Sequence, residues 1–99
     1  RVDSALVYPN PVEGPARFTF LLSQAAAVRV RIYTLAGRMV RDLGEQYCSF
    51  GYNEVSWDGR DRDGILLPNG IYLYSVNARS GQSGKSQSTT VRDRLIVMR

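Results

Sequence analysis

The sequence predicts an all-β domain, and three features of the chain indicate it. Apolar and polar residues alternate with a period of two over several runs, as in strands that bury one face. No stretch carries the three-and-four spacing of an amphipathic helix. Segments rich in Gly, Pro, Asn and Ser separate the alternating runs. Because 99 residues support a single core, we expect one domain over residues 1–99.

The first three strands follow from alternation and from the prolines near the start of the chain. Ala5 to Tyr8 is expected to be short, because Pro9 and Pro11 lack the N–H group that a strand ladder requires. Arg17 to Leu22 and Val28 to Thr34 alternate strictly, so each presents one apolar face.

A tight turn at Gly37 connects to the fourth expected strand, Arg38 to Leu43. Val40 and Leu43 have opposite parity in that segment. Either a bulge lies between them or Leu43 belongs to the next loop.

Three further strands complete the prediction: Tyr52 to Trp57, Ile71 to Arg79 and Thr89 to Met98. The segment Ser80 to Ser88 is rich in Ser, Gly and Gln, so we expect it to be a mobile hairpin loop. About seven short antiparallel strands with turns between them predict an immunoglobulin-like β-sandwich of two sheets. We expect the following side chains in its core: Phe18, Phe20, Val30, Ile32, Val55, Trp57, Tyr72 and Tyr74.

The composition argues against an enzyme. The chain has no His and one Cys, which removes the best proton-transfer group at neutral pH and most metal-ligand sets. We therefore expect no catalytic residue and no cofactor. Cys48 has no partner within the chain and is expected to be a buried apolar residue, with an intermolecular disulfide as the alternative. No apolar run of about 18 residues is present, so we expect no membrane insertion.

The segment from Trp57 to Gly64 holds three carboxylates, those of Asp58, Asp61 and Asp63. They are calcium candidates, but Gly59 stands at a ligand position of an EF-type loop and no Glu follows. Two interleaved arginines also compete for the carboxylates. We expect a pair of turns without metal, in which Asp side chains accept from backbone N–H groups and Gly supplies positive φ.

The net charge is +4, and five arginines are candidates for a basic stripe across strand faces: Arg29, Arg31, Arg41, Arg92 and Arg94. Such a stripe binds nucleic acid by neutralising phosphates. However, acidic residues are interspersed and no nucleic-acid-binding signature is present. We expect a solvated face and no nucleic-acid partner.

Four separated motifs resemble the FlgD-type immunoglobulin-like domain, a pattern shared by C-terminal sorting domains of type IX secretion cargo. The motifs are Tyr8-Pro9-Asn10-Pro11, Ile32-Tyr33 followed by Gly37 and Val40, Gly51 followed by Trp57-Asp58-Gly59, and Gly70-Ile71-Tyr72. The resemblance covers residues 6–78 in order, and Leu95 to Arg99 resembles the final strand of the sorting domains.

The resemblance implies a non-enzymatic C-terminal module of a larger bacterial protein. The absence of catalysis is expected of the module and does not extend to the parent protein. The module would direct that protein through a type IX-like secretion system, from the periplasm, where it is in transit, to the cell surface or the medium. Its partner would be the secretion machinery or an adjacent domain. The alternatives are a structural or adhesive spacer packed on a neighbouring domain, for example a protease, and a flagellar hook-assembly domain.

The last strand carries the candidate docking residues Arg92, Arg94, Ile96 and Met98, which share one face. Leu95 and Val97 lie on the opposite face, so the strand has apolar residues on both faces. One face is expected in the core. The other is either a docking surface or is covered by Ala5 to Tyr8 or a neighbouring domain.

Overall fold

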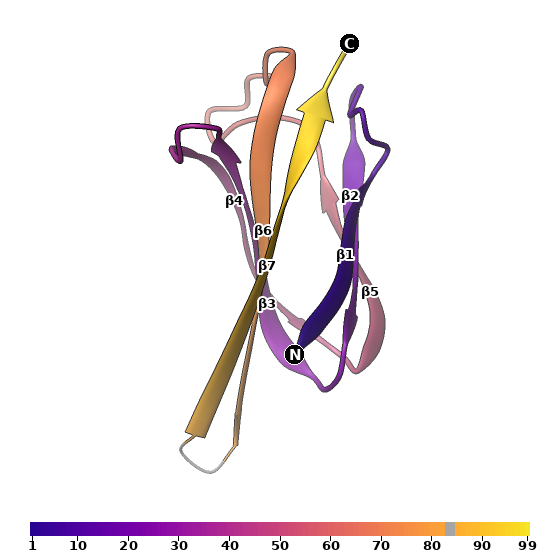
Figure 1. The fold of residues 1–99 in the computed structure, drawn as a ribbon, viewed down its shortest axis with the longest axis vertical. Coiled ribbons are helices and arrows are strands. Elements are labelled where there is room, and N and C mark those ends of the chain that lie inside the picture. The colour runs from indigo at the N-terminus through magenta and orange to yellow at the C-terminus, as the bar shows by residue number, and fades with distance from the viewer. Residues whose placement is uncertain (83–84) are drawn as a thin grey trace.

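The computed structural model describes residues 1–82 and 85–99 as two antiparallel sheets packed face to face (Figure 1). One sheet has the strand order β1-β2-β5, and the other has the order β4-β3-β6-β7. The seven strands are β1 (Val2–Tyr8), β2 (Ala16–Leu22), β3 (Ala26–Thr34), β4 (Met39–Cys48), β5 (Gly51–Trp57), β6 (Gly70–Gln82) and β7 (Lys85–Val97). The predicted all-β sandwich is confirmed. Within the described residues, no helix is long and apolar enough to cross a membrane.

The core lies between the sheets, because strands of both sheets turn alternate apolar side chains inward. All eight side chains expected in the core are buried. Phe18 on β2 joins the two sheets, since its ring centroid lies 5.1 Å from that of Tyr74 on β6. The same ring lies 5.9 Å from Trp57 on β5. Burial of apolar surface on both inner faces is therefore the main stabilising term.

Strand β1 begins earlier than expected, at Val2 and not at Ala5. Its pairing with β2 shifts between Asp3 and Leu6, and Ser4 adopts a positive φ of 54°. The irregularity places both Val2 and Ala5 in the core although their positions have opposite parity. A search for strict alternation therefore missed the first three residues of this strand, Val2 to Ser4.

Strand β4 is longer than predicted. It contains a bulge, which was one of the two explanations for the opposite parity of Val40 and Leu43. Between the pairs Arg29–Glu45 and Arg31–Asp42, β4 carries one residue more than β3. Gly44 lies in this bulge with a φ of 85°, which a residue with a side chain adopts poorly. The strand then continues to Cys48, whose thiol is buried as expected. Desolvation by burial raises the pKa of that thiol.

The expected loop from Ser80 to Ser88 is wrong over the residues that the structure describes. The β6–β7 ladder continues through the pairs Arg79–Ser88 and Ser80–Gln87 to Gln82–Lys85. The two strands thus form a long ribbon that projects beyond the rest of the sandwich (Figure 1). Ser and Gly lowered the strand signal there, but backbone pairing depends little on the side chain. Residues 83 and 84, on which part of the loop prediction falls, lie outside the described residues.

Candidate docking surface

Strand β7 divides its side chains between the core and the outer face as predicted. Leu95 and Val97 are almost fully buried. Ile96 and Met98 are 38% and 57% exposed. Arg92 and Arg94 are exposed on the same outer face by strand alternation. The alternative that β1 covers this face is wrong, because β1 belongs to the other sheet and leaves both apolar side chains exposed.

The register of the four-stranded sheet places further apolar side chains next to Ile96. Ile71 is its direct partner on β6. Leu73 pairs with Tyr33, and Tyr33 pairs with Met39. Directly opposite residues share a face, so these side chains form one continuous surface. We call it the outer patch and define it as Tyr33, Met39, Ile71, Leu73, Ile96 and Met98.

Two of the outer-patch residues, Ile96 and Met98, are docking candidates predicted from the sequence. The other four were missed as site residues because their proximity depends on which strands pair and in which register. Ile71 and Leu73 did carry a usable signal, since they alternate with the buried tyrosines of β6 and therefore point outward. Tyr33 and Met39 become neighbours of Leu73 only through the order β4-β3-β6.

The free edge of β7 is closed near its end by the segment that follows β1. The Val12 N–H donates to the Ile96 carbonyl at 2.6 Å, and the Met98 N–H donates to the Val12 carbonyl at 2.9 Å. The Ile96 N–H donates to the Asn10 side-chain oxygen at 3.1 Å. An added strand therefore cannot pair with this part of the edge, whereas the outer face beside it remains exposed at Ile96 and Met98.

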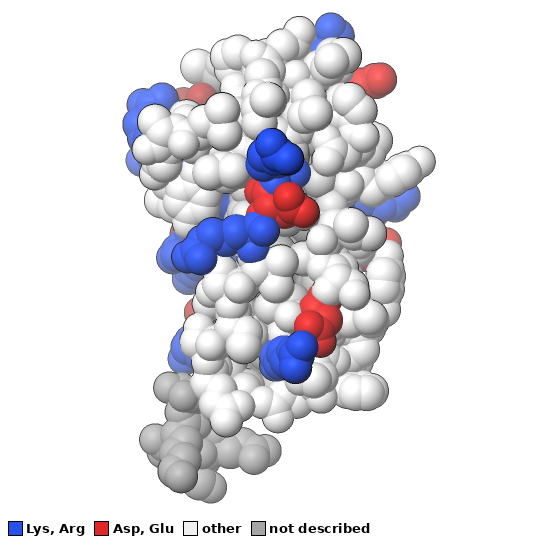
Figure 2. Space-filling model, in the orientation of Figure 1, with Lys and Arg blue, Asp and Glu red and all other residues white. Residues whose placement is uncertain are grey.

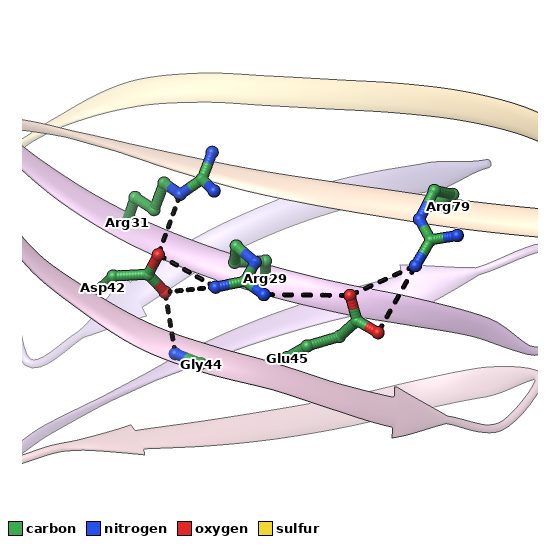
Figure 3. Close-up of polar contacts among 6 residues, drawn as sticks. All are labelled: Arg29, Arg31, Asp42, Gly44, Glu45 and Arg79. Atoms are coloured by element: carbon green, nitrogen blue, oxygen red, sulfur yellow. Dashed lines mark hydrogen bonds and ion pairs between the residues drawn. The ribbon is translucent and has the colours of Figure 1, made fainter.

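Below the outer patch, the same face of the sheet carries an ion-pair network centred on Asp42 (Figure 3). The Asp42 carboxylate accepts hydrogen bonds from Arg29 at 2.9 Å and from Arg31 at 3.1 Å. It also accepts from the Gly44 N–H at 2.8 Å. Partial desolvation raises the Asp42 pKa, but these three donors together outweigh it and hold the pKa below its usual value. The network extends to Glu45, which pairs with Arg79 at 3.2 Å.

The carboxylates proposed as calcium candidates do not converge on a common point. One Asp58 oxygen accepts from the Arg60 N–H at 3.0 Å and from the Arg41 guanidinium at 2.9 Å. One Asp61 oxygen accepts from the N–H groups of Asp63 and Ile65. Among the residues that the structure describes, no group of three or more candidate ligands is placed to hold a metal ion. The predicted Asp-capped turns are confirmed, and Gly59 and Gly64 have positive φ within them.

The sequence predicted that Arg60 and Arg62 would compete for the carboxylates, but their guanidinium groups donate hydrogen bonds to backbone carbonyls instead. Arg60 donates to the Gly64 carbonyl and Arg62 to the Met39 carbonyl. Arg41 from β4 takes their place at Asp58, 2.9 Å away. Partial desolvation raises the Asp58 pKa, but the Arg60 N–H and the Arg41 guanidinium outweigh it and lower the pKa overall.

Three of the five arginines considered for a basic stripe are paired with carboxylates. Arg29 and Arg31 pair with Asp42, and Arg41 pairs with Asp58. On the face shown in Figure 2, basic side chains lie beside acidic ones and wide neutral areas separate the groups. This distribution favours the solvated face over a continuous phosphate-binding stripe.

A family model described as the FlgD Ig-like domain matches residues 10–82, which is most of the chain. The chain belongs to the FlgD Ig-like domain family. It is 34% identical over 61 residues to the basal-body rod modification protein FlgD of Salmonella typhimurium and to that of Salmonella typhi. The match covers 62% of this chain but 26% of each relative, so the chain spans about a quarter of their length.

Three solved structures resemble the fold. A dimeric latent PorU from Porphyromonas gingivalis has a TM-score of 0.76 at 27% identity, over 97% of this chain and 9% of PorU. FlgD from P. aeruginosa has a TM-score of 0.56 at 26% identity, over 83% of this chain and 61% of FlgD. PorZ, described as an essential surface component of the type IX secretion system of P. gingivalis, has a TM-score of 0.52 at 29% identity, over 98% of this chain and 12% of PorZ.

Proposed function

We propose that this domain is a non-enzymatic C-terminal sorting and anchoring module, which directs a larger secreted or surface protein through a type IX-like secretion system. The likeness to PorU carries the proposal, because it covers 97% of this chain and includes almost all of the fold. The share of PorU and PorZ that it covers is 9% and 12%, which is consistent with a small module in a long chain. The parent protein would pass through the periplasm and remain at the cell surface or enter the medium.

The extent of the matches along the chain favours this proposal over hook assembly. The family model ends at residue 82, before β7 begins at Lys85. The FlgD structure corresponds to 83% of the chain, whereas the PorU and PorZ structures correspond to 97% and 98%. The chain thus resembles the type IX proteins over more of its length, and the added part is consistent with the strand that bears the docking residues.

A flagellar hook-assembly domain is the second candidate function, supported by the 34% identity to FlgD of Salmonella. A passive spacer packed on a neighbouring domain is the third. Both share the sandwich, because a fold of this kind serves many functions.

A reporter fusion tests the proposal against both alternatives. Residues 1–99 are fused behind a secretable reporter in a bacterium that has a type IX system, and the immunoglobulin-like domain of Salmonella FlgD serves as the matched control. We expect the reporter to reach the surface or medium with this domain and to stay in the periplasm with the control. Retention of both fusions would contradict sorting, and rescue of hook assembly in a strain without FlgD would identify the second function instead.

A further inference from the structure

We propose that the outer patch and two arginines beside it form one binding surface for a second polypeptide, whose contact region is apolar and bordered by carboxylates. The proposal rests on the proposed function in one respect: it takes that polypeptide to be a component of the secretion machinery. Beyond the proposed function, the proposal specifies that the surface extends across four strands and that the partner's contact region is apolar with carboxylates at its border.

The apolar part is larger than a solvated sheet face requires. Ile71, Ile96 and Met98 are exposed on it, and Tyr33, Met39 and Leu73 are half-buried beside them. They come from β3, β4, β6 and the end of β7, so the surface spans the full width of the sheet. Contiguous exposed apolar residues of this extent mark interaction sites more often than scattered ones do.

Two arginines border the patch. Arg94 is the direct partner of Leu73 across the β6–β7 ladder, and Arg92 lies two residues further along the same face. Among residues 1–82 and 85–99, no ion pair joins either of these two guanidinium groups to a carboxylate.

The nearest acidic side chain on β7 does not neutralise this border. One oxygen of Asp93 accepts the backbone N–H of Arg94 at 2.7 Å. Further down the same face, by contrast, Arg29, Arg31 and Arg79 are all paired with Asp42 or Glu45. Among the arginines that strand alternation places on this face, those without an ion pair, Arg92 and Arg94, therefore lie beside the apolar patch, where a partner with carboxylates at its border complements them.

The shape of the surface favours a protein over a lipid membrane. A membrane interface binds apolar groups that reach roughly 5 to 10 Å into the headgroup region. Here the central residues Tyr33, Met39 and Leu73 are half-buried in a sheet face and do not stand on a protruding loop. A sheet face of this kind matches another protein surface.

Site-specific photocrosslinking in the full parent chain, in its own bacterium, tests the surface. A benzophenone amino acid replaces Ile71 on the outer patch, and in a control it replaces Leu6, which is 63% exposed on the other sheet. We expect one discrete protein adduct from position 71 and a much weaker one or none from position 6. Mass spectrometry should place the adduct in an apolar segment that contains Asp or Glu.

Charge reversal tests the arginine border. Arg92→Glu with Arg94→Glu should weaken the adduct at least about tenfold, because like charges then face the partner. Arg1→Glu, remote from the patch, is the matched control and should leave the adduct unchanged. All variants must melt within about 2 °C of wild type, since a larger shift reports altered folding.

Three outcomes would overturn the surface: no protein adduct from position 71, an adduct with lipid or with the parent chain itself, or an adduct that is insensitive to reversal of both arginines. Export of the parent is measured in the same cells. Normal export without the adduct refutes this surface and leaves the sorting function standing. An adduct that depends on the arginines, in cells where the module does not direct export, refutes sorting and leaves the surface standing.

Discussion

Trp57 packs in the core and also hydrogen-bonds to the turn that follows β5. Its ring is 2% exposed and packs against Phe18. Its Nε1–H donates to the Arg60 carbonyl at 3.0 Å, which holds the turn that follows β5. A buried aromatic side chain with a satisfied polar tip contributes both apolar burial and a specific orientation.

Replacing this side chain should therefore be among the most destabilising single changes. We expect Trp57→Ala to lower the free energy of unfolding by roughly 3 to 5 kcal/mol, because it removes apolar contacts and leaves a cavity. Trp57→Phe keeps a ring in place and should cost clearly less. Urea denaturation of the purified domain measures both, and a loss below about 1 kcal/mol for Trp57→Ala would contradict the core assignment.

The carboxylates of Asp58 and Asp61 are occupied by hydrogen bonds from the chain itself. Calcium binding would require these bonds to break and the carboxylates to converge, so we expect no binding in the millimolar range. Calorimetric titration should give no heat, and the melting temperature should not change. A rise of several degrees at millimolar calcium would show that the turn rearranges into a metal site.

At the scale of elements, β2, β3 and the centre of β6 were predictable and the irregular strands were not. Strict alternation in Arg17 to Leu22 and Val28 to Thr34 reflects one buried face per strand, and that information is local. The bulge at Gly44 and the shift after Asp3 change the parity within a strand. A simple period-two pattern then breaks, although backbone pairing continues.

The bulge of β4 directs Asp42 toward two arginines of β3, and this gives the sheet a testable pH dependence. The Asp42 and Asp58 pKa values are lowered in the folded state. The two carboxylates therefore contribute fully to the stability of the folded state when the pH is above their unfolded-state pKa. This contribution is lost as the pH falls through their folded-state pKa values, below about 4. Thermal unfolding should show stability declining in this acidic range.

Asp42→Asn isolates the contribution of this network. We expect it to lower stability at pH 7 by about 1 kcal/mol, because the pairs are partly solvated. It should also make the decline between pH 5 and pH 2 shallower than in wild type, since one shifted group no longer titrates. Asp3→Asn, at an exposed ion pair of the other sheet, is the control and should change both quantities less. Parallel pH profiles for wild type and Asp42→Asn would contradict a stabilising role.

At the scale of the whole molecule, the end of the chain is fixed by contacts from distant segments. Val12 and Asn10 hold the edge of β7. The Arg99 N–H donates to the Asn69 side chain at 2.9 Å, and its guanidinium group donates to the carbonyls of Leu67 and Gly59. These contacts link residues far apart in sequence, so local patterning did not reveal them. The alternation within Leu95 to Met98 did predict correctly which side chains remain on the outer face.

The central claim is that the domain directs export through the outer face of its last strand. The most direct measurement compares a reporter carrying the wild-type domain with one carrying Ile96→Ser and Met98→Ser, two side chains that are 38% and 57% exposed. Leu6→Ser with Leu21→Ser, exposed on the opposite sheet, is the matched control. Export and the melting temperature of the purified domain are recorded for each. We expect the β7 variant to accumulate in the periplasm while its melting temperature stays within about 2 °C of wild type, and the control to be exported normally. Unchanged export of the β7 variant would contradict the claim and favour a passive spacer.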